Sequence, residues 1–277
     1  MNKNDRFWRL QYDKYLALAY DSKNKYESWQ PGRWASNRSV VKLLGKYFKD
    51  INKSLELGAG SAAFSLELHK QYGCKIAAVD MSLEAKKYAQ LIAGDMGIPI
   101  SYKHGNIFNE TSRADLVMSL GVIEHYSHKK QVAFIRKCAE LSNKYILIAI
   151  PNQESILFRS YIEWANQDNG EYEEEHKRMT VYELRDMMKQ CGLNVVHIDG
   201  FQVFLSEKEF WNETNIQKIP LYIDMKKHIA EKNINWPDFP IMNFSCDDIP
   251  QMVDVETKLG EKVRLKYGFM TYVLAEK

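Results

Sequence analysis

One run of residues in this 277-residue chain has the types and spacing that suit a nucleotide-like ligand. The run LELGAGSAA, residues 55–63, contains Glu56, Gly58, Ala59 and Gly60. The two glycines allow a tight turn and let a ligand approach the main chain, and a helix beginning after them presents free amide groups. The run therefore predicts a strand-to-helix turn that binds a nucleotide-like molecule.

This glycine pattern alone leaves two classes of protein open. A G-x-G-x-x-A spacing also marks domains that bind NAD, and Ala63 fits its third position. Asp80 follows Gly60 by twenty residues, at the end of the next predicted strand. A carboxylate there can accept hydrogen bonds from ribose hydroxyls in either class, so Asp80 does not discriminate between them.

Two further features do discriminate. Glu56 precedes the first glycine by two residues, where an acid suits a cationic amino-acid group and is an awkward neighbour for a pyrophosphate. The apolar run LVMSL, residues 116–120, is followed directly by GVIEH, residues 121–125. With these features the chain resembles the class I S-adenosylmethionine (SAM)-dependent methyltransferases, in the branch whose fourth strand runs into G-V-[IL]-E-H. The resemblance covers residues 33–201 and resumes in the final strand.

The resemblance implies a set of cofactor-binding residues. Matched to the family pattern, they are Glu56, Gly58, Ala59, Gly60, Asp80, Met81, Asn106, Ile107, Leu120, Gly121 and Arg33. The motif acid and glycines would line the methionine end of SAM, Asp80 the ribose, and Met81 the adenine. Asn106 departs from the usual Asp, although its amide oxygen can still accept a hydrogen bond from the adenine amino group. Arg33 would approach the carboxylate of SAM, with Arg38 as an equally placed competitor.

Candidate catalytic residues follow from what methyl transfer requires. The sulfonium leaving group is already activated, so the protein must align the acceptor and, for a hydroxyl or amine, remove a proton. We predict His125 as the base, beside Glu124, with His176 as a further candidate, because an unperturbed histidine pKa near ~6.5 suits this role. The alternative is that Glu124 and His125 only shape the pocket. Some relatives complete a divalent metal site around this pair, but the acid they place three residues earlier is Gly121 here, so we predict no metal.

The elements that must position these residues are read from the periodicity of apolar side chains. Short apolar runs alternate with segments of helical period, which predicts a doubly wound α/β fold with a mostly parallel, seven-stranded sheet. The predicted strands are Ser54–Leu57, Lys75–Asp80, Ile100–Lys103, Ala114–Leu120, Tyr145–Ile150, Leu193–Ile198 and Tyr267–Leu274. The predicted helices are Ala62–Tyr72, Leu83–Met96, Lys129–Leu141 and Thr180–Cys191. The last of these has a capping box, Thr180 with Glu183, and a terminating Gly192.

Four segments are expected along the chain. Residues 1–45 form an aromatic-rich helical or lid segment, residues 46–205 the SAM-binding domain, and residues 265–277 a last strand that returns to the sheet. Residues 206–264 interrupt the alternation with four prolines and several aromatic residues, and we interpret them as an inserted substrate lid or subdomain.

Composition limits the class of protein and its expected location in the cell. Hydrophobic residues make up 45% of the chain and charged residues 27%, as in ordinary globular proteins. The sequence has neither an apolar run long enough for a membrane span nor an N-terminal secretory signal, and its four cysteines form no CxxC pair, so we expect a cytoplasmic protein without disulfide bonds. The net charge is +2, although residues 1–53 alone carry +7.

The sequence thus predicts a methyltransferase that uses SAM, releases S-adenosylhomocysteine (SAH), and acts on O or N of a small molecule. RNA or protein methylation is the alternative that the basic N-terminal segment favours and the near-neutral whole disfavours. A SAM-binding module without catalysis and an NAD-dependent oxidoreductase are the remaining alternatives. Nucleic acid and membrane partners are not expected, and the oligomeric state is left open.

Overall fold

A computed structural model describes residues 3–23, 25, 30–169, 179–205 and 218–277. Its strands are β1 (Lys53–Leu57), β2 (Lys75–Asp80), β3 (Ile100–His104), β4 (Ala114–Leu120), β5 (Ser142–Pro151), β6 (Asn194–Phe201) and β7 (Met270–Glu276). Its α-helices are α1 (Lys3–Asp21), α2 (Pro31–Leu43), α3 (Gly45–Phe48), α4 (Ala63–Tyr72), α5 (Leu83–Asp95), α6 (His128–Leu141), α7 (Ile156–Asn169), α8 (Val181–Gln190), α10 (Pro220–Glu231), α11 (Ile249–Lys258) and α12 (Glu261–Tyr267). Short 3₁₀ turns include η2 (Ile107–Asn109), η3 (Ile123–His125) and η5 (Cys246–Asp248).

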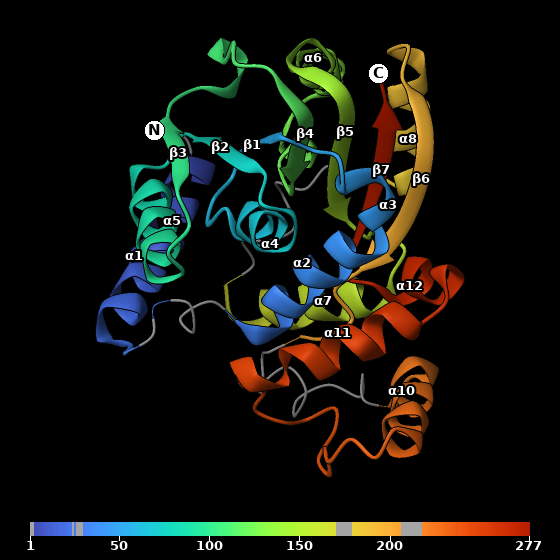
Figure 1. The fold of residues 1–277 in the computed structure, drawn as a ribbon. Coiled ribbons are helices and arrows are strands. Elements are labelled where there is room, and N and C mark those ends of the chain that lie inside the picture. The colour runs from blue at the N-terminus through green and yellow to red at the C-terminus, as the bar shows by residue number, and fades with distance from the viewer. Residues whose placement is uncertain (1–2, 24, 26–29, 170–178, 206–217) are drawn as a thin grey trace.

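The seven strands form one sheet in the order β3-β2-β1-β4-β5-β7-β6 (Figure 1). β1 pairs in parallel with β2 and β4, and β7 pairs antiparallel with both β5 and β6. The chain leaves β1 toward β2 on one side and later returns on the other side to β4. This is the switch point at which doubly wound sheets bind ligands, outside the carboxyl ends of their strands. The predicted α/β class and the mostly parallel sheet are confirmed.

Helices cover both faces of the sheet, and β5 shows why its sequence is almost wholly apolar. Its residues Ile146, Ile148 and Ile150 pack in one buried cluster with α6 and α8. The alternate residues Leu147 and Ala149 belong to a second cluster with α2, α3 and α4. Because successive side chains of a strand point to opposite faces, a strand buried on both faces must be apolar throughout.

The carboxyl edge of the sheet is the more heavily covered edge. Helices α2, α7, α11 and α12 gather below the ends of β5 and β6 in Figure 1, while α1 lies alongside α5. The aromatic-rich N-terminal helix expected from the sequence is therefore present. α11 packs along α2, and both contribute to a single buried cluster with α1 and α5.

The prediction fails at the beginning of the last strand. Tyr267 was expected to start that strand, but it ends α12, and β7 starts at Met270. The chain turns at Gly268, where a Cβ would come within 2.7 Å of the Arg264 carbonyl oxygen and of Phe201 backbone atoms. This close packing of backbone on backbone is a tertiary contact that apolar periodicity does not reveal. The capping box of Thr180 and Glu183 on α8 is confirmed.

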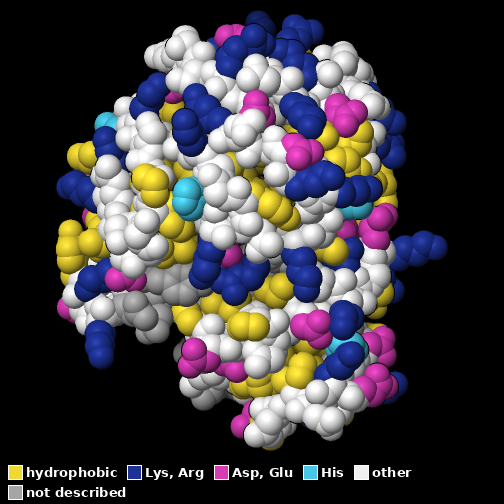
Figure 2. Space-filling model, viewed as in Figure 1, with side chains coloured by type: hydrophobic (Ala, Val, Ile, Leu, Met, Phe, Trp, Pro, Cys, Tyr) yellow, Lys and Arg dark blue, Asp and Glu magenta, His cyan; other side chains and the backbone are white. Residues whose placement is uncertain are grey.

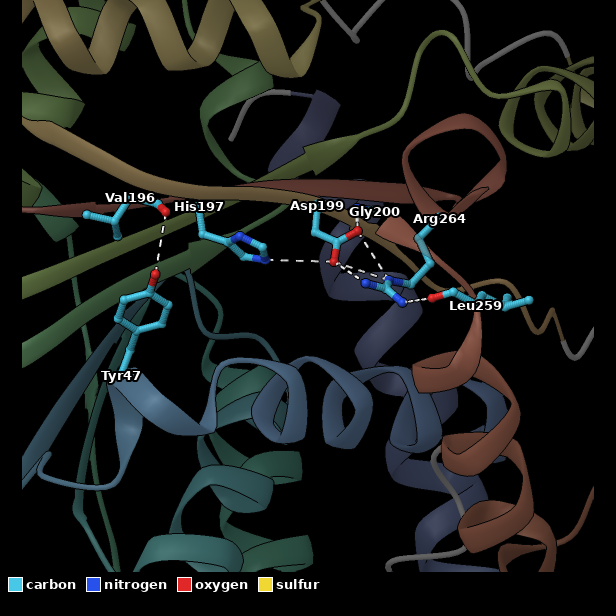
Figure 3. Close-up of polar contacts among 7 residues, drawn as sticks. All are labelled: Tyr47, Val196, His197, Asp199, Gly200, Leu259 and Arg264. Carbon is cyan, nitrogen blue, oxygen red and sulfur yellow. Dashed lines mark hydrogen bonds and ion pairs between the residues drawn. The ribbon is translucent and has the colours of Figure 1, made fainter. Parts of the chain in front are cut away.

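A buried ion pair fastens α12 to β6 (Figure 3). Asp199 of β6 lies between His197 and Arg264, and its Oδ2 is 2.5 Å from Nη2 of Arg264. Arg264 also donates to the carbonyl oxygen of Leu259, and the Gly200 amide donates to Asp199 Oδ1 at 2.7 Å. Both charged side chains are almost fully buried, at 1% and 6% exposure. Their charges are compensated by each other and by these additional hydrogen bonds.

Candidate functional site

The glycine run forms the turn between β1 and α4. Gly58 and Gly60 have φ values of +70° and +51°, in the left-handed region that side chains disfavour. Ala62, the residue before α4, shares this region with φ of +55°. The sequence-predicted turn is therefore present, and its glycines are required by backbone conformation.

The amides of this turn are already engaged. Gly58 and Ala59 both donate to the carbonyl oxygen of Val79, at 2.8 and 3.2 Å. Gly60 donates to Oδ2 of Asp80 at 2.9 Å. The free amides expected from the sequence were those at the start of the following helix; the amides of these three turn residues are used instead by acceptors at the end of β2. An anion at the turn must find its donors elsewhere.

Glu56 lies beneath the first turn of α4. Its Oε2 accepts hydrogen bonds from the Ser65 hydroxyl at 2.5 Å and from the Ser65 amide at 3.3 Å. The Ala63 amide in turn donates to the Ser61 hydroxyl at 3.4 Å. Burial raises the pKa of Glu56 to about 7 in spite of the Ser65 hydrogen bonds, and nearby Asp80 adds to the rise. Glu56 thus stabilises the helix start from inside the protein.

Asp80 ties the turn to the end of β2. One carboxylate oxygen accepts from Gly60, and the other accepts from the Ser82 amide at 2.8 Å. The N-cap of α5 is Ser82, whose hydroxyl accepts from Ala85 at 3.0 Å, so Asp80 is not that cap. Burial raises the pKa of Asp80, although these backbone hydrogen bonds oppose the rise. Each oxygen retains lone pairs for a ligand hydroxyl. Met81 follows with 58% of its surface exposed.

The residues predicted beside the adenine lie at the end of β3. Asn106 precedes the turn η2 and accepts a hydrogen bond from the Phe108 amide at 3.0 Å through its side-chain oxygen. Ile107 is buried at 4% exposure, in the cluster that includes Val79. Asn106 therefore also serves as a local cap, a role that its residue type alone would explain.

The GVIEH segment meets the glycine turn directly. Leu120 ends β4, and Gly121 follows with φ of +71° and donates to the Ala149 carbonyl oxygen at 3.0 Å. The side chain of Val122 lies where a Cβ on Gly58 would stand. The two motifs, about sixty residues apart in the sequence, are thus in contact at the switch point of the sheet.

Glu124 is the most unusual side chain of this segment. It is 2% exposed, and its Oε2 finds no hydrogen-bond partner within the described part of the chain. Burial raises its pKa to about 8, so the carboxyl group is mostly protonated at neutral pH. Buried polar atoms are rarely left without a partner, and such an atom at a sheet edge is a typical feature of a functional site.

α1 closes over both motifs from outside. The Trp8 ring meets the His125 ring edge-on, with centroids 6.4 Å apart. One helical turn further, the Tyr12 hydroxyl lies where a Cβ on Gly60 would stand. The Tyr102 hydroxyl donates to the carbonyl oxygen of Gly60 at 2.8 Å. The sequence showed Tyr12 only as one of many aromatic residues and gave no signal for Tyr102.

The two competing arginines have different environments. Arg38 forms a bidentate ion pair with Glu67 of α4, with both N–O distances at 2.9 Å. Arg33 is half-buried on the same helix α2, and its positive charge acts on the hydroxyl of Tyr12. Arg33 is the stronger candidate for a ligand anion, because its charge acts on Tyr12 at the glycine turn whereas Arg38 pairs with Glu67.

His176 lies outside the described residues. Within the described ranges, no three His, Cys, Asp or Glu side chains are grouped so that they could hold a metal ion. None of the helices the structure describes is both long and apolar enough to cross a membrane.

Comparison with known proteins identifies a family. The model of a family described as a methyltransferase domain matches residues 26–198. A search of curated proteins finds no match.

Solved structures share the fold at low sequence identity. Magnesium protoporphyrin IX methyltransferase from Synechocystis PCC 6803, crystallised with SAH, is 14% identical, with a TM-score of 0.55 over 71% of this chain and 90% of that chain. A possible histamine N-methyltransferase from Thermotoga maritima is 15% identical, with a TM-score of 0.51 over 99% of this chain and 97% of that chain. The cyclopropane synthase MmaA2 from Mycobacterium tuberculosis is 13% identical, with a TM-score of 0.51 over 86% and 84%.

Proposed function

Since this chain belongs to the methyltransferase-domain family, we propose that it transfers the methyl group of SAM to an oxygen or nitrogen atom of a small molecule. One observation carries the proposal. Val122 packs on Gly58, so the glycine turn and the segment that holds Glu124 and His125 form one site. A cofactor bound at the turn would lie beside both candidate acid–base groups.

The residues present fit SAM. Asp80 has lone pairs for ribose hydroxyls, the buried oxygen of Glu124 lacks a partner within the described residues, and Arg33 supplies positive charge near the turn. SAM, when bound, supplies a methyl group on a positively charged sulfur. The protein then has to bind, orient and, for an O–H or N–H acceptor, take up a proton.

His125 is the better candidate for the proton acceptor. Glu124 is mostly protonated at neutral pH because its pKa is raised to about 8, so it is a poor base there. His125 ends η3, beside Trp8 of α1, and its side chain is only partly buried. A protonated Glu124 can instead donate a hydrogen bond within the site and help to fix its geometry.

The charges on the face shown in Figure 2 favour a small acceptor over a nucleic acid. The face shown in Figure 2 mixes basic and acidic side chains and does not gather the basic ones into a single stripe. A polyanion requires such a stripe for its phosphates. The structural neighbours do not narrow the acceptor further, because their names refer to a magnesium porphyrin, to histamine and to cyclopropane synthesis.

Calorimetric titration with SAM, SAH and NADH tests the proposal. We expect micromolar binding of both sulfur compounds and none of NADH. Asp80→Asn should weaken SAH by about 1–3 kcal/mol through the loss of charged hydrogen bonds to the ribose. Binding of neither sulfur compound would refute the proposed function, and NADH binding would favour the oxidoreductase.

The catalytic assignment needs a second experiment. With the labelled methyl group of SAM, transfer to a panel of small phenols, amines and carboxylates would identify the acceptor. His125→Ala should then lower turnover by about 10²–10⁴-fold while SAH binding stays within about twofold. Unchanged turnover would show that His125 only shapes the pocket.

A further inference from the structure

α1 points one tyrosine at the glycine turn. Tyr12 is 8% exposed, and its ring lies 5.9 Å from that of Tyr15 and 6.1 Å from that of Tyr88 on α5. Tyr15 and Tyr88 stack on each other at 5.6 Å. This aromatic group fixes the Tyr12 ring, so that its hydroxyl lies over Gly60.

The amides of the glycine turn, residues 58–60, are not available as hydrogen-bond donors to a bound anion. The amides of Gly58, Ala59 and Gly60 all donate to acceptors at the end of β2. An anionic group that lands on the turn therefore cannot use them, and burying a carboxylate without donors is costly. A side chain that reaches over the glycines can supply a donor in their place.

Tyr12 has the chemistry of such a donor. Burial, together with the negative charge of Asp80, raises the pKa of Tyr12 well above its usual value, so the hydroxyl keeps its proton. Arg33 acts on the same hydroxyl from α2 with a positive charge. A protonated hydroxyl that feels the positive charge of a guanidinium can donate to a carboxylate, while the nearby Asp80 carboxylate already accepts from the Gly60 and Ser82 amides.

We propose that Tyr12 is a cofactor-binding residue, whose hydroxyl donates a hydrogen bond to the carboxylate of the methionyl end of SAM and thereby closes α1 over the site. The inference rests on the proposed function and extends it to the N-terminal helix. Closure has a second consequence, because Trp8 lies one helical turn from Tyr12 and contacts His125. One helix thus covers the cofactor and forms a wall beside the candidate base.

The test compares SAH with decarboxylated SAH, which keeps the adenosine and the ammonium group but lacks the carboxylate. Calorimetry is done on the full chain, on Tyr12→Phe, and on Tyr20→Phe as the control. Tyr20 lies on the same helix and is 65% exposed. Tyr12→Phe keeps the packed ring and removes only the hydroxyl, and a thermal melt checks that it folds.

We expect Tyr12→Phe to raise the dissociation constant of SAH by roughly tenfold or more, the effect of losing a hydrogen bond to a charged group. Its affinity for decarboxylated SAH should stay within about twofold of the unmodified chain, and Tyr20→Phe should change neither ligand. In the unmodified chain, SAH should also slow amide hydrogen exchange in α1 more than decarboxylated SAH does.

Other results would overturn the inference. Unchanged or tighter SAH binding by Tyr12→Phe would mean that the hydroxyl is a spectator or an obstruction. Equal weakening of both ligands would assign Tyr12 to packing, and equal exchange protection would separate α1 from the carboxylate. If the unmodified chain binds both ligands while Tyr12→Phe has no effect, only this inference fails. If the unmodified chain binds neither, the proposed function fails with it.

Discussion

Two buried carboxylates at the same edge of the sheet have opposite environments. Asp199, near the end of β6, has an arginine within 2.5 Å and a backbone amide at 2.7 Å. Glu124, just beyond β4, has a carboxylate oxygen with no partner among the described residues and a pKa raised to about 8. The two side chains are equally inaccessible, at 1–2% exposure.

The difference distinguishes a carboxylate that stabilises the fold from one that lies in the candidate site. The Asp199–Arg264 pair connects α12 to β6, and its charges are satisfied within the protein. Glu124 lies next to the glycine turn, and no cation of the described segments compensates the cost of burying its acid group. A protein tolerates such a cost where a ligand or a reaction uses the group.

The largest expected change in the free energy of unfolding is at the ion pair of Asp199 and Arg264. Arg264→Met should lower the free energy of unfolding by about 3–5 kcal/mol, because it leaves the buried charge of Asp199 without its partner. Urea denaturation at pH 7 measures this. The double variant Asp199→Asn with Arg264→Met removes both charges and should recover part of the loss. A double variant no more stable than Arg264→Met would contradict this account of the pair.

Substitution of Glu124 is expected to raise the free energy of unfolding, the opposite of the effect at Arg264. Below pH 4.5, the ordinary pKa of a glutamate, Glu124 is protonated in both the folded and the unfolded chain. Above that pH Glu124 ionises in the unfolded chain but stays protonated in the folded protein. The free energy of unfolding therefore falls as the pH rises to about 8. Glu124→Gln should therefore be more stable than the unmodified chain by about 2–4 kcal/mol at pH 8 and equal to it near pH 4. Urea denaturation across this range checks the slope.

Glu56 and the exposed Glu154 help to interpret the pH dependence measured for Glu124→Gln. Part of the slope that remains in Glu124→Gln up to about pH 7 belongs to Glu56, and Asp80 and Glu256, whose pKa values are also raised by burial, add to it. Glu154 is exposed, so Glu154→Gln should leave the slope unchanged. If Glu124→Gln were destabilising at pH 8, the carboxyl group would have to be ionised and compensated in the folded protein.

The smallest effects distinguish the two arginines of α2. Arg33→Met should weaken SAH by about 1–3 kcal/mol with little change in unfolding, since its positive charge lies beside Tyr12 at the site. Arg38→Met should lower the free energy of unfolding by about 1–3 kcal/mol, because it leaves the buried carboxylate of Glu67 without this partner. Calorimetry and urea denaturation of both variants would show a reversed pattern if the assignments were exchanged.

The sequence by itself determined the sheet and the positions of the glycine turn and of the segment that follows β4. Apolar runs that alternate with helical periods specify strands buried on both faces, and all seven predicted strands agree with the observed ones to within three residues at each end. The glycines of residues 58–60 and 121 could be placed at strand ends because only glycine readily adopts the positive φ found there. These are local properties, set by side chains a few residues apart.

Tertiary structure alone decided how the charges and the covering helices are used. No pattern in the sequence pairs Arg38 with Glu67, Arg264 with Asp199, or Tyr12 with Gly60, because these partners lie 29 to 65 residues apart and meet only when helices pack on the sheet. Burial also depends on packing, and burial is what raises the pKa of Glu124. The sequence therefore located the two motifs of the candidate site, and the packing of distant segments determined which side chains pair with one another and which are buried.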